Sequence, residues 1–275
     1  MLSDKKRLLS VMIRAAEDAG HVIMKYYNGE FSIEKKEDGT PVTSADIAAS
    51  GVILNILHAE YPDFAIMCEE TDDDKESRLS NDYCFIVDPL DGTKSFVKHT
   101  GEFAVSIAVA EHHEVVAGVI FIPTSGELYY AFKGEGAYKT ILSEDSVNPF
   151  EDKRIHVSDR CNGLIAVQSS SSGDKLAEQI IEENSFRIAD VLRVSSCIKG
   201  CMIADGRADI HYRFAGYTKE WDTAGEEIIC REAGAIVTDA AGGTLTANRE
   251  DVRNLRGIRI INRSESALDS SYINI

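Results

Sequence analysis

The stretch Tyr83–Lys94, with the sequence Tyr-Cys-Phe-Ile-Val-Asp-Pro-Leu-Asp-Gly-Thr-Lys, constrains the fold of this chain more than any other. Its apolar run leads into Asp88, and Pro89, Asp91 and Gly92 follow. The run predicts a buried strand that ends at Pro89, because proline lacks a backbone N–H group and fixes φ. Gly92 permits a tight turn after it. Asp88 and Asp91 are therefore predicted to face one small volume, where two carboxylates need a cation to remain ionised.

Mg²⁺ is the cation that these residues favour. Carboxylates and a turn carbonyl, here that of Leu90, are hard oxygen ligands of the kind that Mg²⁺ prefers. An Asp-x-x-Asp-Gly sequence is also common in polar turns after strands, so the motif alone leaves both interpretations open. Two further acidic segments follow predicted elements: Glu69 and Glu70 end a short apolar strand, and Asp222 lies at the start of a helix.

Composition narrows the class of partner. The chain has 275 residues, 44% of them hydrophobic, which is enough for one large layered domain or two packed subdomains. Its net charge of −17, without a cluster of Lys and Arg, argues against binding a nucleic-acid polymer. A small phosphorylated substrate remains compatible with this charge if metal ions screen it.

The N-terminus, the apolar runs and the cysteines bear on where in the cell the protein is expected. The N-terminus shows an amphipathic pattern with no signal peptide, and no apolar run is long enough for membrane insertion. The six cysteines include no Cys-x-x-Cys pair, and most lie in apolar stretches, which indicates reduced, buried thiols. A cytoplasmic protein is expected, as a monomer or a homodimer.

Hydrophobic periodicity predicts mixed helices and strands. Helices are expected over residues 4–28, 43–61, 174–183, 196–204, 221–233 and 264–270, and a hairpin over 33–39. Strands are expected over residues 64–68, 83–88, 103–110, 115–122, 128–132, 164–167, 187–191, 209–213, 235–238 and 258–261, with a polar connection over 140–160. Alternating strands and helices in the second half indicate α/β layering. Asp46 lies in the first turn of the second helix, where helix capping by itself explains an acid.

The acidic segments, taken in chain order, resemble the inositol monophosphatase superfamily of Mg²⁺-dependent, lithium-sensitive phosphomonoesterases. The shared pattern is an upstream Asp (Asp46), Glu-Glu (Glu69), Asp-Pro-Leu-Asp-Gly-Thr (Asp88 onward) and Trp-Asp (Asp222), and it covers nearly the whole chain. The resemblance implies a layered α-β-α-β-α sandwich of mixed α/β (α+β) class. We expect an N-terminal subdomain over residues 1–145 that carries most metal ligands, and a C-terminal subdomain over 146–275 that completes the site.

The resemblance also implies the ligands of two or three Mg²⁺ ions. Glu69, Asp88 and the carbonyl of Leu90 would hold the first ion, and Asp88, Asp91 and Asp222 the second; a loosely held third ion would involve Glu70. The expected nucleophile is an activated water molecule, whose proton Thr93 with Asp46 or Glu69 would accept. No covalent enzyme intermediate is expected.

Within the superfamily the chain is most similar to 3′(2′),5′-bisphosphate nucleotidases of the bacterial CysQ type. The segments that carry this closer similarity are Asp88–Lys98, Gly101–Phe103, Ser195–Lys199 and Tyr212–Phe214. The similarity implies hydrolysis of 3′(2′)-phosphoadenosine 5′-phosphate to AMP and phosphate. The substrate contacts it implies are Gly92, Thr93, Lys94, Ser196, Lys199, Arg213 and Asp222. Lys199 and Arg213 can instead be read as surface charges.

Two departures from the closest relatives bear on the substrate. Gln168-Ser169-Ser170-Ser171, the start of a serine run that continues to Ser172, stands where the relatives have Ser-Arg-Ser-His, and Gly234-Ala235 replaces their Gly-Gly. Inositol or sugar phosphates are therefore the alternative substrates.

Other classes of protein fit less well. The chain lacks the Asp-x-Asp of haloacid-dehalogenase phosphatases in this segment, and it has no P-loop, since no Gly-x-x-x-x-Gly-Lys precedes Ser or Thr. A non-catalytic binding scaffold remains the alternative outside the enzymes.

Overall fold

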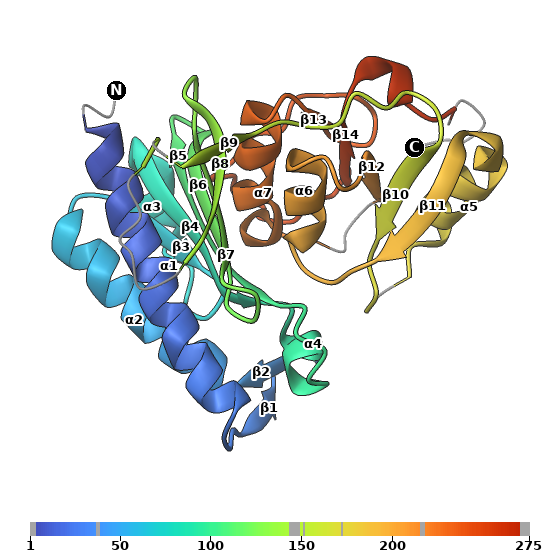
Figure 1. The fold of residues 1–275 in the computed structure, drawn as a ribbon. Helices are drawn as coiled ribbons and strands as arrows, with labels where there is room; N and C mark the ends of the chain where they lie inside the picture. The colour runs from blue at the N-terminus through green and yellow to red at the C-terminus, as the bar shows by residue number, and fades with distance from the viewer. Residues whose placement is uncertain are drawn as a thin grey trace.

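Two large β-sheets and three layers of helices alternate through the described part of the structure, in the order helix, sheet, helix, sheet, helix (Figure 1). The computed structural model describes residues 4–36, 39–142, 149–150, 152–171, 173–214 and 218–269. This arrangement is the layered α/β sandwich that the sequence predicts. The first outer layer consists of α1 (Lys5–Tyr27) and α2 (Ser44–Glu60), beside the short hairpin of β1 (Ile33–Lys35) and β2 (Pro41–Thr43).

The larger sheet has seven strands in the order β3-β4-β5-β6-β7-β8-β9. They are β3 (Ala65–Cys68), β4 (Tyr83–Asp91), β5 (Ala104–Glu111), β6 (Glu114–Ile122), β7 (Glu127–Phe132), β8 (Gly136–Ile141) and β9 (Lys153–Ile155). Only the pair β3 and β4 is parallel in this sheet as described. Short helices α3 (Lys75–Ser80) and α4 (Thr93–Val97) precede and follow β4.

Helices cover both faces of this sheet, which explains its nearly continuous apolar strands. In β4, Phe85 and Val87 pack in one core with α1 and α2, while Cys84 and Ile86 pack in a second core with the middle helices. The alternation follows from the two-residue period of a strand. Both faces are therefore buried, and functional groups can reach a surface only at strand ends.

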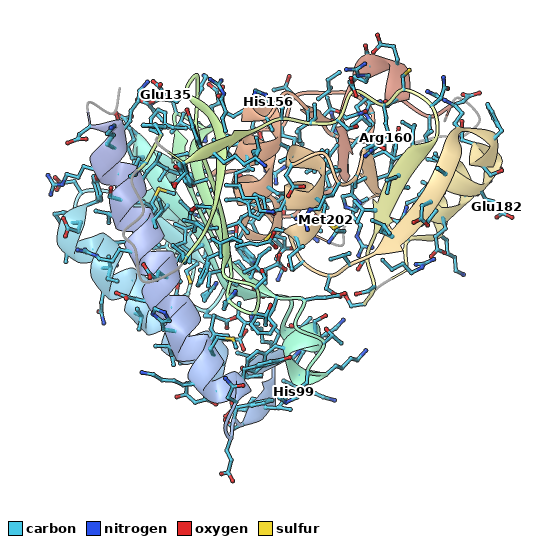
Figure 2. The ribbon with its side chains drawn as sticks, viewed as in Figure 1. His99, Glu135, His156, Arg160, Glu182 and Met202 are labelled. Carbon is cyan, nitrogen blue, oxygen red and sulfur yellow. The ribbon has the colours of Figure 1, made fainter. Side chains whose placement is uncertain are left out.

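The middle layer consists of α6 (Ile198–Ala204) and α7 (Glu220–Glu232). Helix α7 lies close against β6: a Cβ atom at Gly118 would approach Ile228 Cγ2 to 2.5 Å and the Gly225 carbonyl oxygen to 3.0 Å. Met202 of α6 lies in this same core (Figure 2). The middle helices thus belong to the second half of the chain but pack on the sheet of the first.

The smaller sheet has five strands in the order β11-β10-β12-β14-β13. They are β10 (Leu164–Gln168), β11 (Ile188–Arg193), β12 (Ile210–Arg213), β13 (Ile236–Thr238) and β14 (Ile258–Ile261). Helix α5 (Lys175–Glu183) covers its outer face through Ala177 and Ile180. Two 3₁₀ turns, Ser185–Arg187 and Ser264–Ser266, complete the assigned elements.

Several predictions of local structure need correction. Strand β4 does not end at Pro89 but continues to Asp91, with a register shift between Asp88 and Asp91; a missing N–H group is tolerated at such a bulge. The connection predicted over residues 140–160 contains β9, and residues 264–270 form only a 3₁₀ turn within their described part. Helices α3 and α4 and strand β8 were not expected.

The subdomain boundary between residues 145 and 146 lies outside the described residues. Strand β9, which follows it, still pairs with β8 of the larger sheet. The division into two subdomains therefore stays a prediction. Among the described residues, every helix is too short or too polar to cross a membrane.

The contact at Gly118 predicts a stability effect. Gly118→Ala should lower the free energy of unfolding by about 1–3 kcal/mol, because the new methyl group meets α7 backbone that cannot move aside cheaply. Chemical denaturation followed by circular dichroism measures this change. Gly51→Ala, in the exposed part of α2 with no atom within 4 Å of the new Cβ, is the control and should stabilise by about 0.5–1 kcal/mol. Equal effects of the two substitutions would contradict the packing argument.

Candidate metal and phosphate site

Two parallel strands deliver the first acids of the site. Cys68, the last residue of β3, pairs with Val87 of β4, so Glu69 and Asp88 follow at neighbouring positions of the same sheet edge. The Glu69 amide donates to the Val87 carbonyl at 3.1 Å, which fixes this register. Asp88 is buried and Glu69 half-buried. The predicted convergence of these two acids is therefore produced by the strand pairing itself.

Gly92 turns the chain directly after β4. It has a φ of 101°, and a Cβ atom there would lie 2.7 Å from the Glu102 carbonyl oxygen. Both the left-handed backbone and the close approach require glycine at this position. The turn places Thr93 at the start of α4 and leads the chain away from Asp91.

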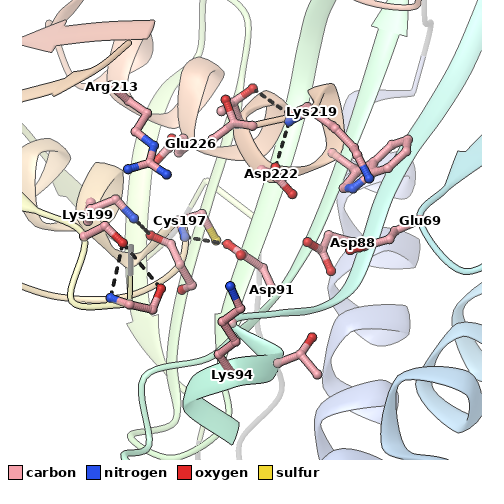
Figure 3. Close-up of a pocket in the computed structure, with 18 of the residues that line it drawn as sticks. Glu69, Asp88, Asp91, Lys94, Cys197, Lys199, Arg213, Lys219, Asp222 and Glu226 are labelled. Carbon is pink, nitrogen blue, oxygen red and sulfur yellow. Dashed lines mark hydrogen bonds between the residues drawn. The ribbon is translucent and has the colours of Figure 1, made fainter. Parts of the chain in front are cut away.

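Asp222 reaches the same volume from the other half of the chain. It lies in the first turn of α7, where its carboxylate accepts a hydrogen bond of 2.7 Å from the Lys219 amide. Carboxylate oxygens of Glu69, Asp88 and Asp222 all lie within 4.8 Å of one another. Figure 3 shows these groups facing a common space with Asp91.

Burial and mutual repulsion make this group a candidate cation site. Burial, and then the carboxylates of Glu69, Asp91 and Asp222, raise the pKa of Asp88 well above its usual range. Burial, Asp91 and Glu69 likewise raise the pKa of Asp222 to about 8. An all-oxygen set of acids that is this unfavourable when ionised fits a divalent cation such as Mg²⁺.

Asp91 and Leu90 are also predicted ligands, but their oxygens already contact other groups of the protein. Asp91 lines the pocket, but its carboxylate accepts a hydrogen bond from the Cys197 amide and lies outside the group of three within 4.8 Å. The Leu90 carbonyl oxygen lies 3.2 Å from Thr93 Oγ1. Both oxygens face the site, each with a protein partner.

Asp46 serves as a helix cap and also reaches the site. Its Oδ2 accepts hydrogen bonds from the amide and the hydroxyl of Thr43, which completes a capping box at the start of α2. Its Oδ1 accepts a hydrogen bond of 3.1 Å from Thr93 Oγ1. The two interpretations of Asp46 are therefore compatible, since each carboxylate oxygen has its own partner. Burial raises the pKa of Asp46.

Lys36, which the sequence did not single out, contacts the acids from the β1–β2 hairpin. Its ammonium lies 2.9 Å from Glu69 Oε1 and 2.7 Å from Glu70 Oε1. Burial lowers the pKa of Lys36, but the two carboxylates outweigh it and raise the pKa overall. Alternating polar residues around position 36 indicated a hairpin but not which side chain would face the acids.

Positive groups form the wall opposite the acids. Lys199 of α6 and Arg213 of β12 are only 9% and 7% exposed, so the interpretation of both as surface charges is wrong. The Lys199 ammonium donates to the carbonyl of Ser196, whose backbone is left-handed with a φ of 61°. Figure 3 shows Lys199 and Arg213 on the side of the pocket away from Glu69 and Asp88. Lys94 lines the pocket from an exposed position.

A buried, neutral histidine lines the same cavity as these cations. Burial, Lys199 and Arg213 lower the pKa of His211 to about 3. His211 Nδ1 lies 2.8 Å from the Val167 carbonyl, so the neutral ring donates there and presents Nε2 as an acceptor. His211 is two residues before Arg213 on the same strand face, a spacing that could have indicated it.

Most of these groups, but not Lys36, Asp46 or Glu70, line one cavity of about 350 Å³. Sequence reasoning missed several of its lining residues: Thr40, Pro41, Cys197, His211, Thr218, Lys219, Trp221, Thr223, Glu226 and Ile258. Five of them, Thr218, Lys219, Trp221, Thr223 and Glu226, lie within four residues of Asp222, which was the available signal. The volume suits a small molecule.

The serine segment that departs from the relatives also contributes to the cavity wall. Ser169 and Ser171 line the pocket. Ser170 Oγ donates to Glu102 Oε2 at 2.9 Å and lies 2.7 Å from Ser195 Oγ. This segment is therefore tied to both halves of the chain by short polar side chains.

Comparisons with known proteins agree with this geometry. The curated 3′(2′),5′-bisphosphate nucleotidase CysQ of Salmonella typhimurium is 38% identical over 240 residues, which cover 86% of this chain and 93% of that protein. Among solved structures, CysQ from Bacteroides thetaiotaomicron has a TM-score of 0.82 at 35% identity, covering 94% of this chain and 99% of that one. A Thermotoga maritima IMPase has a TM-score of 0.77 at 27% identity, covering 93% and 92%. The sequence model of the inositol monophosphatase family matches residues 4–271. The chain thus belongs to the inositol monophosphatase family.

Proposed function

We propose that this protein is a Mg²⁺-dependent phosphomonoesterase that hydrolyses 3′(2′)-phosphoadenosine 5′-phosphate to AMP and phosphate. The observation that carries the proposal is the pairing of three converging carboxylates, from Glu69, Asp88 and Asp222, with a buried cationic wall in one cavity. The choice of substrate follows from the curated relatives, which are named for 3′(2′),5′-bisphosphate nucleotidase activity.

The acids fit the metal that the family implies. Glu69 and Asp88 with the Leu90 carbonyl would hold one Mg²⁺, and Asp88, Asp91 and Asp222 a second; a third near Glu70 would have to compete with Lys36. Bound Mg²⁺ supplies Lewis-acid polarisation of the phosphate and lowers the pKa of the attacking water.

Thr93 and Asp46 are positioned to move the proton of that water. Thr93 Oγ1 already donates to Asp46 Oδ1 at 3.1 Å, so it can accept a proton from water while passing its own to the carboxylate. The raised pKa of the buried Asp46 favours this transfer. Glu69 is the alternative acceptor, and in this arrangement its Oε1 contacts Lys36.

The remaining predicted contacts would bind the substrate. The amides of Gly92 and Thr93, with Lys94 at the mouth of the cavity, would contact the phosphate that is cleaved. Lys199, Arg213 and Ser196, which line the same cavity, would bind the second phosphate.

Hydrolysis of inositol or sugar monophosphates is the second candidate. It is favoured by the likeness to the Thermotoga maritima IMPase and by Ser169 and Ser171, whose short side chains replace the longer ones expected of a nucleotide site. Lithium inhibition, a cytoplasmic location and a monomeric or homodimeric state remain predictions from the sequence.

A comparison of substrates tests the proposal. With Mg²⁺, kcat/KM for 3′-phosphoadenosine 5′-phosphate should exceed that for inositol 1-phosphate, measured by phosphate release. Asp91→Asn should reduce turnover of the preferred substrate about a thousandfold, because a charged ligand of the second ion is lost. Faster hydrolysis of inositol 1-phosphate would favour the second candidate. Activity of Asp91→Asn within tenfold of the original would contradict the metal assignment.

The cationic wall predicts a selective effect of Arg213→Gln. Loss of a charge-assisted hydrogen bond should reduce kcat/KM for 3′-phosphoadenosine 5′-phosphate about 10–100-fold. Adenosine 3′-monophosphate, which lacks the second phosphate, should be affected much less. An equal loss on both substrates would show that Arg213 does not bind the second phosphate.

The raised pKa values predict how Mg²⁺ stabilises the protein at different pH. The pKa of Asp222 is about 8 in the folded protein and about 4 in an unfolded chain. The folded state therefore holds a proton between these values, and this stabilising contribution, full below about pH 4, is lost as the pH rises through 8. Mg²⁺ can replace the proton, so the increase in Tm on adding Mg²⁺ should be larger at pH 8 than at pH 6.

The control for this experiment is Asp222→Asn. The amide cannot titrate, so the increase in Tm that Mg²⁺ causes should depend less on pH in this variant. Equal increases in Tm at pH 6 and pH 8 for the original protein would contradict the cation site.

A further inference from the structure

A buried arginine far from the cavity connects the two halves of the chain. Arg78 of α3 is 1% exposed. Its Nε and Nη2 bind the two carboxylate oxygens of Asp73 at 2.5 and 2.9 Å, which balances its charge locally. Its Nη1 donates to Asn248 Oδ1 at 2.9 Å and to the Arg249 carbonyl at 2.7 Å, while Asn248 Nδ2 donates back to the Arg78 carbonyl at 2.7 Å. All three guanidinium nitrogens of Arg78 and its backbone carbonyl therefore have hydrogen-bond partners.

The same two residues of the β13–β14 connection hold the start of α7. Glu220, the first residue of α7, is 3% exposed and accepts hydrogen bonds from the amides of Asn248 and Arg249. Arg249 Nε also donates to Glu220 Oε1 at 2.9 Å. Glu220 is two residues before Asp222, so this contact fixes the turn of helix that presents Asp222 to the cavity.

Asn254 completes the connection. Its Oδ1 accepts a hydrogen bond of 2.7 Å from Arg249 Nη2. Its Nδ2 lies within hydrogen-bond distance of Thr218 Oγ1, the Lys219 carbonyl and Thr223 Oγ1, at 3.0, 3.1 and 3.0 Å. These partners lie on both sides of Asp222 in the sequence, and Asn254 is only 6% exposed.

We propose that Arg78, Asn248, Arg249, Glu220 and Asn254, here called the Arg78 network, position Asp222 against Glu69 and Asp88 and thereby set the affinity for Mg²⁺. Arg78 lies in the segment between β3, which delivers Glu69, and β4, which delivers Asp88. The network therefore joins the backbone that carries two of the acids to the helix that carries the third. Carboxylates that repel one another need such a rigid link, because a small shift of Asp222 relieves the repulsion and spoils the site.

The proposal rests on the metal site of the proposed function, and Mg²⁺ binding without substrate tests it. Isothermal titration of the full-length protein with Mg²⁺ should show that Arg78→Met and Asn254→Ala raise the Kd about tenfold or more. An increase in the Kd of Arg78→Met is informative, because removing a positive charge would by itself strengthen the binding of a cation and lower the Kd. Asn254→Ala changes no charge. Arg78→Lys keeps the charge but not the fork of donors, and should give an intermediate Kd.

A second link between the halves provides the control. Tyr129 of β7 donates to Asp205 Oδ2 at 2.9 Å, and Arg207 Nη2 donates to the Tyr129 hydroxyl at 2.7 Å. Asp205 lies at the end of α6 opposite Cys197, which contacts the site. Tyr129→Phe should lower Tm without changing the Kd for Mg²⁺.

The outcomes separate this inference from the proposed function. An unchanged Kd in Asn254→Ala and in any Arg78 variant that folds, with losses of Tm like that of Tyr129→Phe, would overturn the positioning role and leave the metal site intact. Should Arg78→Met not fold, Asn254→Ala and Arg78→Lys decide. Absence of Mg²⁺ binding by the original protein would overturn the metal site and this inference together.

Discussion

Repulsion among the carboxylates of Glu69, Asp88 and Asp222 is the constraint on which the rest of the structure depends. Acids held this close are unfavourable when ionised, and the raised pKa values of the buried Asp88 and Asp222 express that cost. The two cores on either face of the larger sheet stabilise the backbone that holds them. Apolar packing holds strands β3 and β4 and helix α7, and the proposed Arg78 network adds to it, so the acids stay close together. In the proposed function, a divalent cation is the partner that restores their ionised form.

The positions of the acids in the sequence made part of this site predictable. Each acid directly follows an apolar run or begins a helix, and strand ends and helix starts are where a layered α/β fold exposes functional groups. Asp88 and Glu69 could therefore be paired from the sequence, and the structure joins them through parallel strands. The layered fold was predictable for the same reason, since the periodicities of strands and helices alternate clearly.

Other features depend on contacts between distant residues, and no local pattern encodes them. Lys36 faces two acids only because the β1–β2 hairpin folds over the end of β3. The burial of Lys199 and Arg213 follows from how the smaller sheet and α6 meet the larger sheet, whereas the sequence shows only charged residues on short elements. Strand β4 continues past Pro89 because a bulge removes the need for its N–H group, which a rule about proline alone does not foresee.

The net charge of −17 gives the buried cations a particular importance. A strongly acidic protein attracts Mg²⁺ and repels phosphate esters, but at physiological ionic strength both effects fade beyond about 8 Å. Recognition of an anionic substrate must then come from short-range contacts inside the cavity. In the proposed function, Lys199 and Arg213 would provide these contacts, and their burial would make each interaction stronger. The neutral state of His211, which burial and then the same two cations enforce, adds an acceptor and no third positive charge. In the proposed function, the wall would therefore distinguish a substrate by its hydrogen-bond donors as well as by its phosphates.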